Sequence, residues 1–280
     1  MSHLTKKSVL RTLALPLIMA SVTVLSGCAT TMKAETRLAY DKTQQTLQSQ
    51  PVSIISDGCL IRIENGNNDI MYQQSDMASR AMAQTVKARL LEKGVKVNHI
   101  SSPFICGSRT KEMLTKMDIM LTDGAKEQPN TAYPVLSSTN NFDSLTNNAY
   151  QDLYKALIVA RKAASNDPTD YTDLLLNSKS LQIIKNIEGA NKVFVVLAGG
   201  EQPSAGARVT SGALGMVGMI VGVSSMDILV QSQNYGIYLI DLETNQLKWS
   251  KVGNIEGNVF KMPVANSYVL PKMLDPLYPE

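Results

Sequence analysis

The stretch that decides the fold reads KVFVVLA at 192–198, YGIYLIDL at 235–242 and LKWS at 247–250. The first two runs are short, rich in β-branched and aromatic residues and free of polar alternation, which is typical of strands covered on both faces. A polar turn precedes the third run, in which apolar and polar residues alternate, so it predicts a hairpin whose last strand has one wet face. We therefore expect an α/β fold: a mixed sheet with an antiparallel hairpin, covered by helices on both faces, plus an N-terminal tether.

The amino terminus has the pattern of a signal peptide. A basic segment precedes a mostly apolar run at 13–24, which is too short to span a bilayer as a helix. The run ends in LSGC at 25–28, which resembles the lipobox of bacterial lipoproteins. The resemblance implies that residues 1–27 are removed and that Cys28 is acylated. The alternative is an ordinary secreted protein with a chance cysteine at this position.

The same resemblance implies where the protein resides. Acyl chains such as palmitate on Cys28 would anchor it stably, because each buried methylene contributes about 0.8 kcal/mol. Ala29 follows the cysteine, at the position where an aspartate retains enterobacterial lipoproteins in the inner membrane. We expect a lipid anchor in the outer membrane and a body in the periplasm.

Removal of the signal changes the charge balance. The whole chain has 27 Lys and Arg residues against 24 Asp and Glu residues. The signal carries Lys6, Lys7 and Arg11 and no acid, so the mature chain has 24 of each sign. A formal charge of zero gives no support for nucleic-acid binding.

Cys59 and Cys106 are the remaining cysteines. Because the periplasm is oxidising, we expect a disulfide between them, with two separately buried thiols as the alternative. His99 is the histidine of the mature chain, and these residues lack the close ligand spacing of a zinc motif. We expect no metal and no cofactor.

The mature chain is predicted to form a tether at 28–50 and a single periplasmic α/β domain at 51–280. The tether is polar and rich in Thr, Gln and Lys, and we expect it to have some helical character. As a flexible coil it would reach on the order of 25 Å. Short strands are expected at 52–55 and 60–63, separated by a break at 56–58.

Helical periodicity follows these strands. The clearest helix is expected to begin at Ser75 and to end before Gly94, with a strand at 95–100 after it. Apolar stripes predict further helices around 150–158 and from about 170 to 187.

Two segments interrupt this order. A polar loop at 122–148 has the length of a functional loop or flap. A glycine-rich, apolar insert at 199–223 carries glycines at a spacing of three or four residues: Gly212, Gly215, Gly218 and Gly222. As a helix the insert would offer a small-residue face for packing within the protein or its oligomer. Membrane contact and a mobile flap are the alternatives.

The insert does not fit known catalytic motifs. A phosphate-binding loop needs Gly-Lys-Ser/Thr, whereas Gly206 is followed by Ala207. A nucleophile elbow around Ser204 lacks the preceding glycine, and His99 comes before the serine rather than after it. Because no set of acid, base and nucleophile can be assembled, we expect that the protein is not an enzyme.

Three segments carry a resemblance to a family: LLEKGVKV at 90–97, ANKVFVV at 190–196 and YLIDLETNQLKW at 238–249. Their order is similar to that in periplasmic lipoproteins with the fold of the TolB amino-terminal domain and of the curli exporter CsgG. The resemblance covers roughly 52–259 with gaps.

Two functions are considered. The first is a non-enzymatic, membrane-anchored lipoprotein that supports assembly, secretion or envelope maintenance through an envelope protein partner or a homo-oligomer. The second is a periplasmic small-ligand binder or enzyme that uses the 122–148 loop as a lid. A cleft that joins His99, Asp241 or Glu201 would favour the second.

Overall fold

The computed structural model describes residues 33–64, 67–130, 142–163, 171–203, 232–254, 260 and 272–278. Its helices are α1 (Ala34–Ser49), α2 (Tyr72–Glu92), α3 (Lys111–Leu114), α4 (Ser144–Ala163), α5 (Ser178–Glu188) and the short 3-10 helix η2 (Asp275–Leu277). Its strands are β1 (Val52–Glu64), β2 (Asn67–Met71), β3 (Val97–Ile100), β4 (Phe104–Ile105), β5 (Asp118–Met120), β6 (Lys126–Glu127), β7 (Thr172–Asp173), β8 (Lys192–Pro203), β9 (Ser232–Asp241) and β10 (Gln246–Asn254).

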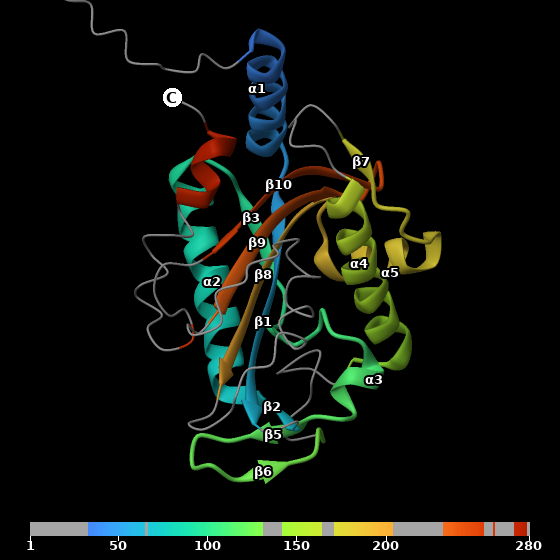
Figure 1. Ribbon diagram of the computed structural model, residues 1–280. Helices are drawn as coiled ribbons and strands as arrows, with labels where there is room; N and C mark the ends of the chain where they lie inside the picture. The colour runs from blue at the N-terminus through green and yellow to red at the C-terminus, as the bar shows by residue number, and fades with distance from the viewer. Residues whose placement is uncertain are drawn as a thin grey trace, which may run out of the picture. The chain divides into compact units, whose positions relative to one another are not determined.

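The described strands form one mixed sheet in the order β6-β5-β2-β1-β8-β9-β10-β7, and β3 and β4 also pair with β1 (Figure 1). At its centre β1 runs parallel to β8, from the pair Val52–Lys192 to the pair Ile63–Pro203. β9 lies antiparallel to both β8 and β10. The predicted mixed sheet with an antiparallel hairpin is confirmed.

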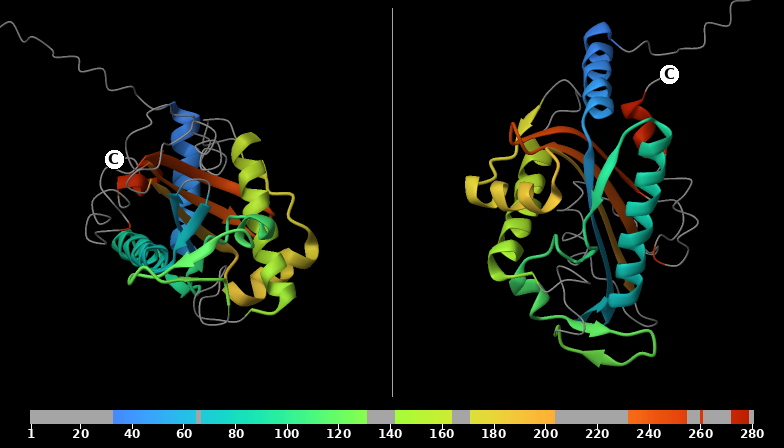
Figure 2. Two further views of the ribbon diagram at one scale, coloured as in Figure 1. Left: turned by 60° about the horizontal axis from the view of Figure 1, so that its bottom comes forward. Right: turned by 180° about the vertical axis from the view of Figure 1, so that it is seen from behind.

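Helices cover both faces of this sheet, as predicted. Helix α2 packs on one face, and α4 and α5 pack on the other (Figure 2). Strand β8 alternates between them: Phe194 and Val196 belong to the core under α2, while Val193 and Val195 belong to the core under α4 and α5. A strand that is buried on both sides needs apolar residues at every position, which explains the unbroken apolar run.

Helix α2 agrees with the prediction to within one turn. It begins at Tyr72 rather than at Ser75, and the chain leaves it through Gly94, which has a φ of +78°. A positive φ is favourable for glycine, which lacks a Cβ atom. The predicted strand after this glycine is β3.

Helix α5 begins later than its apolar pattern suggested. The stretch predicted as helical from about 170 contains strand β7, and the helix begins only at Ser178. The Asn177 side chain caps it by accepting a hydrogen bond from the Ser180 backbone N–H at 2.9 Å. At its other end Gly189 takes the left-handed conformation that closes the helix.

The predicted break at 56–58 is wrong, because β1 is continuous through it. Gly58 is needed inside the strand: a Cβ atom there would lie 2.2 Å from the Ser75 carbonyl oxygen of α2. Asp57 is buried within the strand because backbone N–H groups from another segment satisfy its carboxylate. Both residues are typical of turns, and here tertiary packing outweighs that local preference.

The glycine-rich insert begins later than expected, because β8 continues as far as Pro203. Gly200 lies within the strand, where a Cβ atom would approach the Phe260 ring to 2.8 Å. Close contact with an aromatic ring therefore explains this glycine. Residues 204–231, with Gly212, Gly215, Gly218 and Gly222, lie outside the described residues.

The 122–148 loop is shorter at both ends than predicted. Strand β6 pairs with β5 inside it, and α4 already begins at Ser144. Asp143 satisfies the first turn of α4 by accepting a hydrogen bond from the Thr146 backbone N–H at 2.7 Å. Residues 131–141 lie outside the described part of the chain.

The segment expected as a flexible tether contains helix α1. At 1.5 Å per residue its 16 residues extend about 24 Å. Leu47 is buried in the core under α2, and the Gln44 side-chain amide donates a hydrogen bond to the Leu277 carbonyl at 2.8 Å. These contacts fix α1 to the body, so residues 34–49 have the helical character that was expected but are attached to the domain rather than flexible.

Candidate functional site

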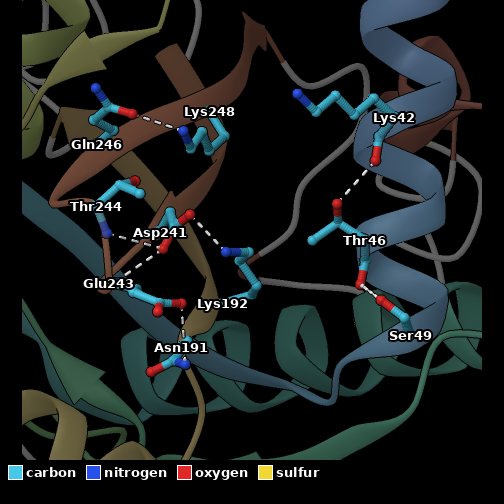
Figure 3. A network of polar contacts seen from close by, with 10 residues as sticks. All are labelled: Lys42, Thr46, Ser49, Asn191, Lys192, Asp241, Glu243, Thr244, Gln246 and Lys248. Carbon is cyan, nitrogen blue, oxygen red and sulfur yellow. Dashed lines mark hydrogen bonds and ion pairs between the residues drawn. The ribbon is translucent and has the colours of Figure 1, made fainter.

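A pocket of about 190 Å³ lies between α1 and the strands β8, β9 and β10. Its lining combines three lysines, one aspartate, two threonines and three apolar or aromatic side chains: Lys42, Lys192, Lys248, Asp241, Thr43, Thr46, Leu47, Leu239 and Tyr171. Figure 3 shows the polar contacts around it.

Strand pairing brings the two deepest charged residues together. Lys192 is the first residue of β8 and Asp241 the last of β9, and the antiparallel register places them directly opposite each other. Lys192 Nζ donates to Asp241 Oδ2 at 2.5 Å, and both side chains are buried. The backbone N–H groups of Glu243 and Thr244 donate to Asp241 Oδ1 at 2.9 and 3.2 Å.

These donors decide the protonation state of Asp241. Burial alone would raise the pKa of its carboxyl group, but the hydrogen bond and the charge of Lys192 outweigh burial and hold the pKa below its ordinary value. The Asp241 carboxylate is therefore ionised at neutral pH.

A bulge in β10 positions Lys248. Leu247 pairs with Ile240 and Trp249 pairs with Leu239, so Lys248 is an extra residue in the register. As a result Leu247 packs under α4 and α5 while Trp249 packs under α2. The predicted alternation, with Leu247 and Trp249 on one face, is wrong because a bulge shifts the strand by one residue.

The Lys248 ammonium group is only partly solvated. Its Nζ donates to Gln246 Oε1 at 2.6 Å and lies 4.0 Å from the centre of the Tyr171 ring. Burial lowers the pKa of Lys248; the carboxylate of Asp241 opposes this, and the positive charges of Lys192 and Lys42 reinforce it.

Helix α1 supplies the other wall of the pocket. The Lys42 side chain extends from α1 toward the strands that carry the other two lysines (Figure 3). The Thr43 and Thr46 hydroxyls donate to the carbonyls of Ala39 and Lys42, each at 2.9 Å. Since these hydroxyl protons are engaged, the lysine ammonium groups are the charged donors that the described lining offers a ligand.

The residues proposed for a catalytic cleft do not come together. His99 lies on β3 and Asp241 on β9, three strands apart, which corresponds to about 14 Å across the sheet. Glu201 lies nine residues along β8 from Lys192, or about 30 Å along the strand. The structure thus places these three side chains at separate sites.

The predicted disulfide joins Cys59 on β1 to Cys106, with their Cα atoms 4.5 Å apart. Beside it the Asp57 carboxylate accepts hydrogen bonds from the backbone N–H groups of Gly107 and Ser108 at 3.0 and 2.9 Å. Burial raises the pKa of Asp57 in spite of these bonds. The cluster fixes the segment that follows β4.

A third buried carboxyl group belongs to Glu188 at the end of α5. It accepts a hydrogen bond from the Ser101 hydroxyl and one from the Tyr150 hydroxyl at 2.6 Å, and burial raises its pKa. The Ser53 hydroxyl donates to the Glu188 carbonyl at 2.6 Å. These contacts link β1, α4 and α5, which indicates a structural role.

The sequence carries a signal for only one part of the pocket, the contact between Lys192 and Asp241. Lys192 begins the first predicted strand and Asp241 ends the second, so antiparallel pairing of the two strands predicts their contact. The contributions of Lys42 and Lys248 depend on the docking of α1 and on the bulge, neither of which has a signal in the sequence.

Other expectations concern residues that lie outside the described part, among them the lipid-attachment residue Cys28. Within the described part, no helix is both long and apolar enough to cross a bilayer. The same part contains no group of three or more His, Cys, Asp or Glu side chains placed to hold a metal ion.

No protein-family model matches the chain, and no curated protein matches it in sequence. Among solved structures, the chain is similar to the LpoB C-terminal domain from Salmonella enterica, at 12% sequence identity and a TM-score of 0.26. The match covers 78% of this chain and 98% of that one. A TM-score this low carries no argument about function, and the resemblance to TolB and CsgG stays a prediction.

Proposed function

We propose that the protein is a non-enzymatic lipoprotein, anchored in the outer membrane through Cys28, whose periplasmic body supports assembly, secretion or envelope maintenance by binding other proteins. The observation that carries this proposal is the docked helix α1. Five residues separate Cys28 from Ala34, and they can extend no more than about 20 Å. An acylated Cys28 would therefore hold the start of α1 within about 20 Å of the membrane surface.

The environment of the buried carboxyl groups supports binding rather than catalysis. Asp57, Glu188 and Asp241 each accept hydrogen bonds from groups of the body itself. They belong to different clusters. His99 lies near enough to act electrostatically on Glu188, but that carboxyl group is engaged by the Ser101 and Tyr150 hydroxyls. An acid and base acting in one reaction would need to face a common cleft.

The proposal is tested on the full chain in cells, with Cys28→Ser as the comparison. We expect the wild-type protein to fractionate with the outer membrane and to give cross-linked adducts with at least one envelope protein or with a second copy. The Cys28→Ser variant should lose both the membrane association and the adducts. Unchanged fractionation of the variant, or a wild-type protein without any adduct, would contradict the proposal.

Self-association through the glycine-rich insert requires its own measurement. Light scattering gives the mass of the detergent-solubilised, acylated protein beside that of a Gly215→Leu, Gly218→Leu double variant. A large assembly that the variant lacks would support an interface at 199–223. A monomer in both would leave a heterologous envelope partner as the mode of action.

A second candidate, a small-ligand binder, is favoured by the lysine-lined pocket. The pocket lies at α1, and none of the described residues of the 122–148 loop, 122–130 and 142–148, lines it. A small-ligand binder that uses this pocket would therefore not need the 122–148 loop as a lid.

A further inference from the structure

The pocket beside α1 has more positive charge than its own residues neutralise. Lys42, Lys192 and Lys248 line it, and among the described residues of the lining Asp241 is the one acidic residue. Lys192 pairs with that aspartate. The pocket lining thus carries a formal excess of two positive charges.

The arrangement of the lysines keeps this excess in one place. Lys192 reaches the pocket from β8, Lys248 from the bulge of β10 and Lys42 from α1. The strands and the docked helix fix all three backbones. The ion pair of Lys192 and the contacts of Lys248 with Gln246 and Tyr171 hold two of the ammonium groups in place. Like charges held together in a partly buried site attract an anion.

The chemistry of the donors favours a phosphate group over a carboxylate. A carboxylate is planar and is best recognised by the fork of an arginine, whereas the lysine ammonium binds phosphate as a compact point charge. A phosphate monoester carries close to two negative charges at neutral pH, which equals the excess of the pocket.

We propose that the pocket bounded by Lys42, Lys192 and Lys248 binds a phosphate monoester or inorganic phosphate. The volume of about 190 Å³ is too small for a large ligand and admits a phosphate group with a few attached atoms. Leu47, Leu239 and Tyr171 provide apolar walls for such an organic part. The inference deepens the second candidate function and does not depend on the protein partner in the first.

The Lys248 environment agrees with this assignment. Burial lowers the pKa of Lys248, and repulsion by Lys192 and Lys42 lowers it further, while Asp241 and Asp173 oppose the shift. A bound phosphate would offset both the repulsion and the lost hydration. Phosphate binding should therefore keep Lys248 charged to a higher pH.

The test is calorimetry on the detergent-solubilised, acylated protein at low ionic strength, with inorganic phosphate and glycerol 1-phosphate as ligands. The variants are Lys42→Gln and Lys248→Gln, and the control is Lys155→Gln, which removes an exposed lysine of α4 outside the pocket. We expect one saturable site. Lys248→Gln should weaken it about tenfold, because this ammonium is partly buried, and Lys42→Gln about threefold. Lys155→Gln should leave the affinity unchanged.

A further arm separates a soluble phosphate from a lipid headgroup. The same protein is titrated with non-ionic detergent micelles, with and without phosphatidic acid. Binding to only the micelles that contain phosphatidic acid, with weaker binding in both pocket variants, would support the proposal. That result would identify a lipid headgroup as the source of the phosphate. The proposal would be overturned if none of these probes bound saturably. Equal affinities in the wild type and both pocket variants would also overturn it. Circular dichroism melts confirm that the variants are folded, and Lys42→Arg, which keeps the charge, should retain binding.

Failure of this test is distinguishable from failure of the proposed function. Calorimetry uses the purified protein alone, whereas fractionation and cross-linking are measured in cells. A protein that binds no phosphate but forms Cys28-dependent adducts would refute the pocket assignment and leave the anchored accessory standing.

Discussion

Two buried aspartates accept hydrogen bonds in the same way but have different roles. Asp57 accepts two backbone N–H groups from the segment after Cys106, and Asp241 accepts two from the hairpin turn. Burial raises the pKa of Asp57, whereas Lys192 holds the pKa of Asp241 below its ordinary value against the effect of burial.

The difference arises from what surrounds each carboxylate. The Asp57 cluster lies beside the disulfide, and its hydrogen-bond donors come from the backbone of the segment that it fixes. The Asp241 cluster opens into a pocket that holds two further lysines. We therefore assign stability to the Asp57 cluster, in the middle of β1, and ligand binding to the pocket beside Asp241.

The largest effect on stability is expected from the disulfide beside the Asp57 cluster. Replacing Cys59 and Cys106 by serine should lower the free energy of unfolding by about 4 kcal/mol, since the bond closes a chain segment with a sequence separation of 47. Urea unfolding of the double variant measures this loss. Phosphate binding by the variant under folding conditions should be unchanged. A simultaneous loss of binding would contradict the assignment of stability and ligand binding to separate places in the sheet.

The next effect concerns the ion pair. Lys192→Met should lower the free energy of unfolding by about 3 kcal/mol, because it leaves the Asp241 carboxylate buried without its cation. A Lys192→Met, Asp241→Leu double variant should recover part of this loss in urea unfolding. Asp57→Asn is the matched substitution in the Asp57 cluster, and it should destabilise the body without altering the affinity for phosphate.

A pH titration sharpens the comparison further. Burial raises the pKa of Glu201 to about 7, although Arg109 opposes the shift. Because the folded-state pKa lies above the unfolded one, the folded protein binds more protons between these values, and stability falls as pH rises through about 7. We expect a decrease on the order of 1 kcal/mol between about pH 5 and pH 8.

Urea midpoints at several pH values measure this slope, and Glu201→Gln should flatten it. Asp241 contributes in the opposite sense, since a lowered pKa gives stability that is lost as pH falls below about 4. A stability that rises steadily from pH 5 to pH 8 would contradict the assignment.

The smallest effect on stability is expected for Lys42→Gln. Lys42 is exposed on α1, so its removal should change the free energy of unfolding by less than about 0.5 kcal/mol. The same substitution should weaken phosphate binding measurably. A large loss of stability would indicate that Lys42 supports the fold rather than the pocket.

Long periodic elements of the fold could be predicted from the sequence. Unbroken apolar runs identify buried strands, so β8 and β9 were placed correctly, and Gly94 correctly closes α2. The disulfide was predicted from compartment and cysteine count. Each of these features depends on local pattern or on composition.

The errors arose where long-range contacts decide the conformation. Gly58 resembles a turn residue, but it lies in a strand because α2 passes directly over it. The alternating pattern of β10 predicts that Lys248 lies on a solvent-exposed face, but Lys248 is the extra residue of a β-bulge, which shifts the register of the strand. Helix α1 has a weak apolar pattern, and its contacts to Leu277 come from the far end of the chain. The pocket is built from the last two of these features.

Hydrogen–deuterium exchange with and without phosphate is the most direct test of the central claim. On this account the pocket beside Asp241 binds phosphate, whereas the Asp57 cluster supports the structure. A phosphate held by Lys42, Lys192 and Lys248 would join α1 to the sheet and slow its local opening. We predict slower exchange in α1 and β10 and unchanged exchange from Cys106 to Arg109. Unchanged exchange in α1, or protection confined to the segment after Cys106, would contradict the account.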